Sequence, residues 1–320
     1  ADFMRGNRGV VFGGWRQHEI PLKLKGASYL EILQSGGGIL DTVRQTRALS
    51  EDELFCRAKG FLDEQLRFGV TTTEIKSGYG LDLENETKQL RVIRRLKNEH
   101  AMDIVATCMA AHAVPPEFAG RTDDYVDFVC AELLPSIAKE HLAQYCDVFC
   151  ETGVFSVEQS RRVLETARSL GMGLKIHADE IDALGGALLA GELGAISAEH
   201  LIATDDAGIF ALAKGGVTAC LLPQTSLYLN KPFARARDMI AAGVPVAGRY
   251  SANRWPTGLR GIPCRPTCHH RKPRHPNWRE QSTMRWHRFP RNSARRWCCG
   301  ATRKCPTRKS RACWGPRCRR

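Results

Sequence analysis

Three histidines occupy matching positions in the sequence, each at the end of a short apolar run. His112 ends the run 103–112, His177 ends the run 174–177, and His200 ends the run 195–200. A single histidine after a strand is usually a hydrogen-bonded structural residue, but three at matching positions indicate a site. Neutral imidazoles beside carboxylates bind divalent metals, which lower the pKa of bound water to ~7 and polarise carbonyls. This set therefore favours hydrolysis of an amide-like bond.

Apolar, strand-like segments alternate with amphipathic segments through most of the chain. Strands are expected at residues 9–12, 70–76, 103–111, 144–150, 173–177, 195–199, 217–222 and 244–247. Apolar strands separated by helices imply a parallel sheet, and eight such units favour a closed (β/α)8 barrel over an open doubly wound sheet. Residues that follow the strand ends of such a barrel share one mouth. Here they are Tyr79, His112, Glu151, His177, Glu180 and His200.

The helix boundaries carry signals of their own. Ser50 and Glu53 form a capping box, and the helix that it opens is expected to end near Phe68, with Gly69 as the stop. Further helices are expected at residues 28–34, 83–98, 156–170 and 232–242. The sequence has no G-x-G-x-x-G after a strand and no phosphate loop, which argues against a nucleotide-binding fold.

The formal charge of +13 is concentrated in the last 73 residues. Residues 248–320 contain 18 Arg and 3 Lys against one acid, Glu280, whereas 26 basic and 33 acidic residues precede them. The same segment holds 7 of the 13 Cys and 5 of the 6 Trp but almost no branched aliphatics, so we expect it not to fold by itself. We therefore divide the chain into a barrel at 1–247 and a disordered tail at 248–320.

The tail admits three interpretations. Arg-rich segments bind phosphate backbones, and clustered Cys and His can hold zinc. The spacing is poor for zinc, because Cys264 and Cys268 are separated by three residues and the later cysteines contain no C-x2-C pair. Enrichment in Arg, Pro, Cys and Trp is what an out-of-frame reading of a GC-rich gene would give. We favour this last interpretation, which the nucleotide sequence can test.

The rest of the composition indicates a cytoplasmic protein. No signal peptide and no apolar run of about 18 residues is present. The six cysteines before residue 248 lie mostly in apolar runs, as reduced core thiols do. We expect a small-molecule substrate and no membrane or nucleic-acid partner, and we leave a homodimer open.

Five motifs carry a resemblance to a known family. They are EIKSGYGLDLENE at 74–86, AHAVPP at 111–116, CDVFCE at 146–151, KIHADE at 175–180 and SAEHL at 197–201. In this order they resemble imidazolonepropionase, a metal-dependent family of the amidohydrolase superfamily, from about residue 10 to residue 247. The resemblance implies hydrolysis of 4-imidazolone-5-propanoate to N-formimidoyl-L-glutamate in histidine degradation, with zinc or iron.

The resemblance also implies roles for single residues. His177 resembles a metal ligand, Glu180 a substrate contact and proton-transfer group, and His200 a stabiliser of the carbonyl oxygen. Glu180 lies three residues after His177 on the same loop, from where a carboxylate can reach the attacking water.

The remaining substrate contacts implied by the resemblance are Arg16, Tyr79 and His112. The guanidinium of Arg16 suits the propanoate carboxylate. Without the family motif, Arg16 reads as an exposed charge and Tyr79 as a packing aromatic.

Two departures from the family pattern fall near the ends of the matching region. The expected H-x-H pair before Gly13 falls on Asn7 and Gly9, and residues 248–251 read GRYS where Thr-Asp is expected. Three of the four expected metal ligands are therefore missing. We predict an N-terminally truncated, incomplete barrel that largely lacks the small β-sandwich of the family, binds metal weakly and hydrolyses its substrate poorly.

Two other functions stay open at this point. One is an inactive barrel relative that only binds ligand, which metal analysis and a hydrolysis assay would distinguish from an enzyme. The other is a nucleic-acid-binding protein that acts through the basic tail. Binding with a steep salt dependence that vanishes on deletion of residues 248–320 would favour it.

Overall fold

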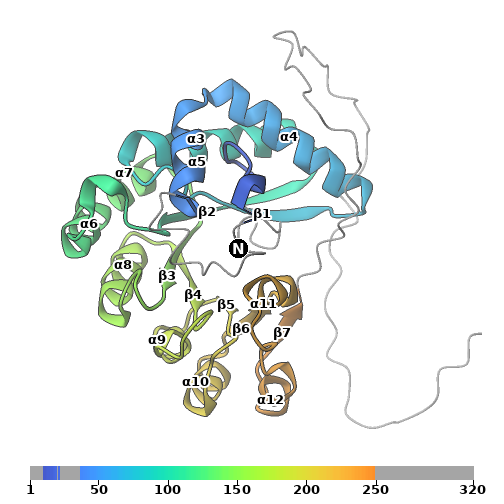
Figure 1. Cartoon of the computed structure of the whole chain (residues 1–320), viewed down its shortest axis with the longest axis vertical. Helices are drawn as coiled ribbons and strands as arrows, with labels where there is room; N and C mark the ends of the chain where they lie inside the picture. Colours follow the sequence, from blue (N-terminus) through green and yellow to red (C-terminus); the bar gives the residue numbers. More distant parts are fainter. Residues whose placement is uncertain (1–9, 20, 22–36, 249–320) are drawn as a thin grey trace, which may run out of the picture. The chain divides into compact units, whose positions relative to one another are not determined.

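The centre of the fold is a parallel sheet in which each strand pairs with the next strand of the chain. The computed structural model describes residues 10–19, 21 and 37–248. The strands are β1 (Thr72–Lys76), β2 (Asp103–Ala111), β3 (Tyr145–Cys150), β4 (Gly173–Ala178), β5 (Ser197–His200), β6 (Thr218–Leu221) and β7 (Val246–Gly248). The sheet curls, and helices cover its outer side (Figure 1). Parallel strands need such covering crossovers.

Among the described α-helices, α3 (Ile39–Ala48) and α4 (Glu51–Arg67) precede β1 and the others lie in the intervals between strands. These others are α5 (Leu83–Glu99), α6 (Thr122–Phe128), α7 (Leu134–Lys139), α8 (Val157–Ser169), α9 (Gly186–Leu193), α10 (Asp206–Gly215), α11 (Pro223–Leu229) and α12 (Ala236–Ala241). Short 3-10 helices are η1 (Gln17–Glu19) and η2 (Pro116–Phe118), and η3 (Val129–Leu133) is a π-helical segment between α6 and α7. No described helix is long and apolar enough to cross a lipid bilayer.

Local sequence explains where the longer helices begin. The Ser50 side chain accepts from the Glu53 N–H at 3.3 Å, and the Glu53 carboxylate accepts from the Ser50 N–H at 2.9 Å, which confirms the predicted capping box. Ser156 and Gln159 form the same arrangement at the start of α8. These caps satisfy backbone donors that a helix cannot satisfy internally.

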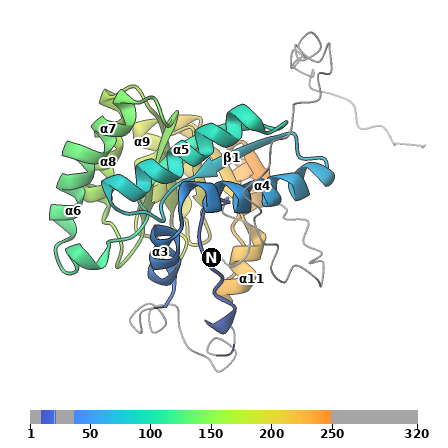
Figure 2. The same cartoon turned by 90° about the horizontal axis from the view of Figure 1, so that it is seen from above.

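The helices are held to the sheet by an apolar stripe. In α5, Leu90, Ile93 and Leu96 are fully buried, whereas Arg91 and Arg94 are exposed. Burial of one such side chain contributes about 1.5–3 kcal/mol. Figures 1 and 2 show α4 and α5 side by side along the outer side of β1 and β2.

The predicted first strand at residues 9–12 was wrong for the residues described. Residues 10–12 belong to no strand, although Val10 and Val11 are buried. The Val11 carbonyl accepts from Gln89 Nε2 at 2.6 Å, and the Gly13 N–H donates to Thr46 Oγ1 at 2.8 Å. This short segment is thus held by helix side chains instead of a strand ladder.

The fold class predicted from the sequence is nevertheless confirmed in its incomplete form. Seven of the eight expected strands form, and among the described residues β1 and β7 each pair with a single strand, so the ring does not close there. The predicted helix at 28–34, the tail from 249 on and the chain ends expected to lack a β-sandwich lie outside the described residues.

Candidate functional site

The three histidines singled out in the sequence come together at one end of the sheet. The ring centroids of His112 and His177 lie 6.3 Å apart, and those of His177 and His200 lie 5.2 Å apart. Phe149 packs edge-on against both His112 and His177. All three histidines are buried. The strands explain this meeting, because His112 follows β2 directly while His177 and His200 lie at or next to the carboxyl ends of β4 and β5.

The backbone is strained where β4 and β5 end. His200 has φ = 70°, and Leu201 and Asp179 have φ of 55° and 49°. Non-glycine residues in the left-handed region cost of order 1–3 kcal/mol each and persist where the surroundings over-determine them. The strain therefore lies at the strand ends that carry His177 and His200.

Glu180 lies beside His200, and Tyr79 lies beside His112. Glu180 Oε1 lies 3.5 Å from His200 Nδ1, and Glu180 is buried. The Tyr79 ring packs edge-on against His112 at 5.4 Å, and His112 Nδ1 lies 3.1 Å from the Gly78 carbonyl. A carboxylate beside one imidazole and an aromatic wall beside another can hold a small polar ring and move a proton.

Arg16 does not lie at a strand end as the histidines do. It lies in the segment 10–19 before α3, and its Nη1 is 3.8 Å from Glu19 Oε2. Glu19 Oε1 accepts from the Gly38 N–H at 2.6 Å. Both side chains of the pair are buried, so the structure contradicts the reading of Arg16 as an exposed charge.

A buried cluster of charges lies on the inner face of the strands, next to His177. Lys76 Nζ donates to Asp147 Oδ2 and, at 2.9 Å, to Glu199 Oε1. Asp147 Oδ1 lies 2.9 Å from His177 Nδ1. Burial acts to raise the pKa of Asp147, but His177 and Lys76 outweigh it and hold that pKa well below its usual range. Such buried charges are tolerated only when they are paired.

A second lysine extends this cluster. Lys175 Nζ lies 3.3 Å from Glu74 Oε2 and 3.1 Å from Ser197 Oγ. Burial favours a higher pKa for Glu74, yet Lys76 and Lys175 leave it lowered. Glu74 also accepts from Thr107 Oγ1 at 2.6 Å. The inner face of the sheet is therefore a network of ion pairs at this depth.

The described residues do not fit a complete metal site. Over residues 10–19, 21 and 37–248, no three His, Cys, Asp or Glu side chains are grouped to hold a metal ion. Asp147 directs one carboxylate oxygen to His177 and the other to Lys76, which also holds Glu199. Catalytic zinc sites use three protein ligands. Asn7 and Gly9, which stand at the family's H-x-H positions, lie outside the described residues.

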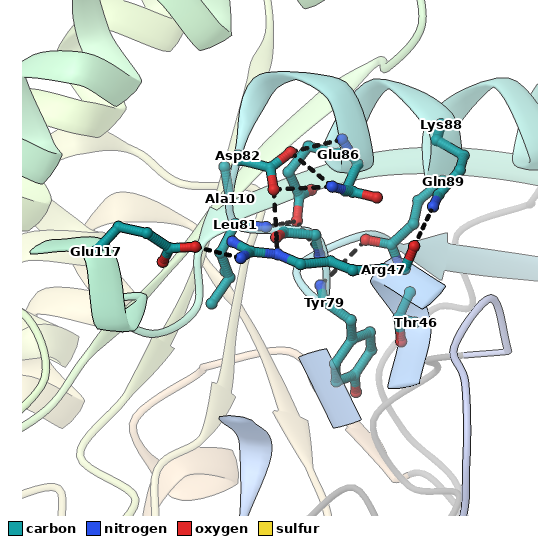
Figure 3. A network of polar contacts seen from close by, with 12 residues as sticks. Thr46, Arg47, Tyr79, Leu81, Asp82, Glu86, Lys88, Gln89, Ala110 and Glu117 are labelled. Atoms are coloured by element: carbon teal, nitrogen blue, oxygen red, sulfur yellow. Dashed lines mark hydrogen bonds and ion pairs between the residues drawn. The ribbon is translucent and has the colours of Figure 1, made fainter. Parts of the chain in front are cut away.

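The loop that carries Tyr79 is wrapped around one buried carboxylate (Figure 3). Glu86, on α5, accepts from the N–H groups of Gly78 at 3.1 Å, Gly80 at 2.8 Å and Leu81 at 2.9 Å. Burial raises the pKa of Glu86 in spite of these bonds. The Glu86 carboxylate thus holds three of the backbone N–H groups of residues 77–81.

Gln89 and Arg47 hold the remaining groups of this loop. Gln89 Oε1 accepts from the Tyr79 N–H at 3.1 Å, while its Nε2 reaches Val11. Arg47 Nε donates to the Gly80 carbonyl at 2.7 Å and lies 3.1 Å from Asp82 Oδ2. Tyr79 is therefore positioned by its backbone as well as by ring packing.

Curated relatives resemble this chain over the region just described. It is 54% identical over 245 residues to an imidazolonepropionase of Clostridium tetani, a match that covers 77% of this chain and 58% of that protein. It is 53% identical over 245 residues to an imidazolonepropionase of Parabacteroides distasonis, with 77% and 59% covered. Over the matched residues, the chain is similar to imidazolonepropionases. The chain spans just under three fifths of the length of these relatives. No family profile matches it.

Solved structures support the amidohydrolase type of fold expected for an imidazolonepropionase. A 5-methylcytosine deaminase from Klebsiella pneumoniae has a TM-score of 0.54 at 14% identity, over 76% of this chain and 60% of that chain. An atrazine chlorohydrolase from Arthrobacter aurescens, solved in complex with zinc, has a TM-score of 0.54 at 17% identity, over 76% and 58%. At such identities the similarity concerns the fold alone.

Several residues around the imidazolonepropionase motifs were missed in the sequence. The interior charges had a usable signal, because Glu74 and Lys76, or Lys175 and His177, are spaced by two and must point to the same face of a strand. Glu86 had no such signal, since its partners are backbone groups of a loop.

Proposed function

We propose that this chain carries the catalytic region of an imidazolonepropionase. Water would add to the ring carbonyl carbon of 4-imidazolone-5-propanoate, and cleavage of the ring C–N bond would release N-formimidoyl-L-glutamate in histidine degradation. The observation that carries this proposal is the meeting of His112, His177 and His200 with Glu180 at the strand ends. The names of the relatives favour this hydrolase over a ligand-binding barrel and over a nucleic-acid-binding protein.

In the proposed reaction, Glu180 takes a proton from the attacking water and returns it to the leaving nitrogen. His200, 3.5 Å from Glu180, stabilises the oxygen of the carbonyl as charge develops on it. Tyr79 and His112 form one wall for the imidazolone ring, and Arg16 pairs with the propanoate carboxylate. Proton transfer and oxyanion stabilisation then come from neighbouring side chains.

The family resemblance implies a divalent zinc or iron ion with His177 as one ligand, and a cytoplasmic enzyme with a small-molecule substrate. The described residues supply His177 but no group of three ligands. We therefore expect this chain to bind metal weakly and to turn over slowly. When bound, such an ion would polarise the ring carbonyl and lower the pKa of the attacking water.

The test uses the full chain with its mass verified. Metal content is measured by plasma mass spectrometry, and imidazolone hydrolysis is followed with and without added Zn²⁺ or Fe²⁺. Glu180→Gln and His200→Asn should each lower any turnover by 10²-fold or more, whereas Glu158→Gln, an exposed change on α8, should not. Normal turnover with one metal per chain would contradict the weak site. Binding of a substrate analogue without hydrolysis under any condition would favour the ligand-binding alternative.

A further inference from the structure

Glu151, at the end of β3, accepts hydrogen bonds from two different loops. Its Oε1 accepts from the N–H groups of Thr152 at 2.9 Å and Asp182 at 3.2 Å. Its Oε2 accepts from those of Glu180 at 2.9 Å and Ile181 at 2.8 Å. The side chain is buried, with 1% of its surface exposed. One carboxylate therefore joins the loop after β3 to the loop after β4.

The far end of the same loop is held by a second carboxylate. Asp179 accepts from the N–H groups of Gly185, Gly186 and Ala187, at 3.0–3.2 Å, where α9 begins. It also accepts from Thr204 Oγ1 at 3.0 Å, in the loop after β5. Residues 179–187 are thus fixed at both ends, and Glu180 lies between the two anchors.

We propose that Glu151 is a positioning residue that holds the main chain of Glu180 so that the Glu180 carboxylate faces His200. Both oxygens of Glu151 are directed at backbone donors, which is the arrangement of an anchor and not of a proton donor to substrate. The N–H of Glu180 is bound directly, so a shift of the anchor moves the residue that lies 3.5 Å from His200 Nδ1. The role of Glu180 in the reaction rests on the proposed function, but its placement by Glu151 does not.

The loop that carries Tyr79 offers a matched control. Glu86 anchors residues 78–81 with the same chemistry, and the Gly78 carbonyl lies 3.1 Å from His112 Nδ1. His200 is therefore the reporter for the Glu151 anchor, and His112 is the reporter for the Glu86 anchor. A Glu→Gln change at either site keeps the size of the side chain but presents an NH₂ donor where N–H groups need an acceptor.

The experiment compares the ring ¹⁵N signals of His112 and His200 in ¹⁵N-histidine-labelled full-length chains. Glu151→Gln should move the His200 signals and leave those of His112, and Glu86→Gln should do the reverse. Movement of both reporters by either variant would indicate general loosening and would overturn the proposal, as would a Glu151→Gln protein with unchanged His200 signals. Hydrogen exchange in the unmodified protein is a second test that needs no variant. The amides of residues 180–182 should exchange at least about tenfold more slowly than unprotected loop amides, and unprotected amides would overturn the proposal.

Turnover separates the placement of Glu180 by Glu151 from the proposed role of Glu180 in the reaction. If the chain hydrolyses imidazolone propanoate, Glu151→Gln should lower kcat by roughly tenfold or more with little change in KM, because the group that it displaces acts in the chemical step. A raised KM at unchanged kcat would overturn the assignment to Glu180. If the chain shows no hydrolysis, the two histidine reporters still decide whether Glu151 positions Glu180.

Discussion

The two loops of the proposed site, residues 77–81 and 179–187, are both held by buried carboxylates, but their anchors come from different places. Glu86 lies only five to eight residues from the N–H groups that it accepts. Glu151 lies 29 to 31 residues from Glu180, Ile181 and Asp182, in the preceding strand and loop unit. The first loop is therefore a local unit, whereas the second depends on the docking of neighbouring units.

The partners of a carboxylate show whether an acidic residue at the end of a barrel strand shapes the site or takes part in its chemistry. Glu151 and Glu180 both follow strand ends, and both could be taken as catalytic carboxylates. Glu151 has both oxygens directed at backbone N–H groups, whereas Glu180 faces an imidazole. A carboxylate that accepts three or four backbone bonds shapes the site, and one that faces another side chain is available for chemistry.

The largest expected effect breaks the local anchor. Glu86→Ala leaves the N–H groups of Gly78, Gly80 and Leu81 buried without this acceptor, at about 1–3 kcal/mol for each group. The free energy of unfolding in urea should fall by about 3 kcal/mol or more. Glu84→Ala, an exposed change on the same helix, should stay within about 0.5 kcal/mol. Similar losses in the two variants would show that Glu86 is no anchor.

Glycines in the two loops allow a sharper comparison. Gly78 has φ = 103° and Gly185 has φ = 102°, so alanine is strained at both positions. A Cβ at Gly78 would lie 2.7 Å from the Met109 carbonyl oxygen, whereas at Gly185 the nearest atom, on Val157, is 3.8 Å away. Thermal or urea unfolding should show a loss of about 1 kcal/mol for Gly185→Ala and at least twice that for Gly78→Ala. Equal losses would mean that the first loop is not the tighter one.

A smaller effect is expected where the second loop is tied to the loop after β5. Thr204→Val removes the hydroxyl that donates to Asp179 and keeps the branched shape. The free energy of unfolding should fall by about 1 kcal/mol. Thr152→Val is the matched control, because Thr152 is exposed and its backbone, not its side chain, meets Glu151. A Thr204 variant as stable as this control would show that the hydrogen bond from Thr204 to Asp179 does not stabilise the protein.

The smallest effect concerns pH, and it has the same sign for both anchors. Burial raises the pKa of Glu86 and of Glu151 above 4.5 in the folded protein. The folded state then binds a proton that the unfolded state does not, so the stability of the protein relative to its Glu→Gln variants should rise as pH falls through the raised pKa of each folded-state carboxyl towards about 4.5. Unfolding curves at several pH values measure this difference. A difference that shrinks on acidification would mean that the N–H bonds outweigh burial.

Much of the fold was predictable because its signals are local. The apolar runs at 103–111 and 144–150 became β2 and β3 almost to the residue, and both the Ser50 cap and the Phe68 end of α4 were read correctly. The run at 9–12 was apolar enough for a strand, but its described residues 10–12 join none; Val11 bonds to Gln89, and the next residue, Gly13, bonds to Thr46. A segment forms a strand only when it pairs with another strand, and a short apolar run does not show whether such a partner is present.

The candidate site was also predictable only in part. His112, His177 and His200 could be brought together from the sequence because strand ends meet on one side of a parallel sheet. The functions of Glu86 and Glu151 could not be predicted, since bonds from a side chain to a distant backbone leave no pattern in composition or periodicity. The metal, substrate and proton-transfer roles of the site residues stay predictions.

The order of the strands has a consequence for synthesis on the ribosome. Each strand from β2 to β7 pairs with the strand made just before it, so every new strand meets an edge that has already left the exit tunnel. Paired residues of neighbouring strands lie 21 to 38 positions apart, so each pairing must wait for a whole crossover helix to emerge, but none needs a strand that is still to be made. Glu151 would leave the ribosome before residues 180–182, and its carboxylate would stay hydrated until they arrive.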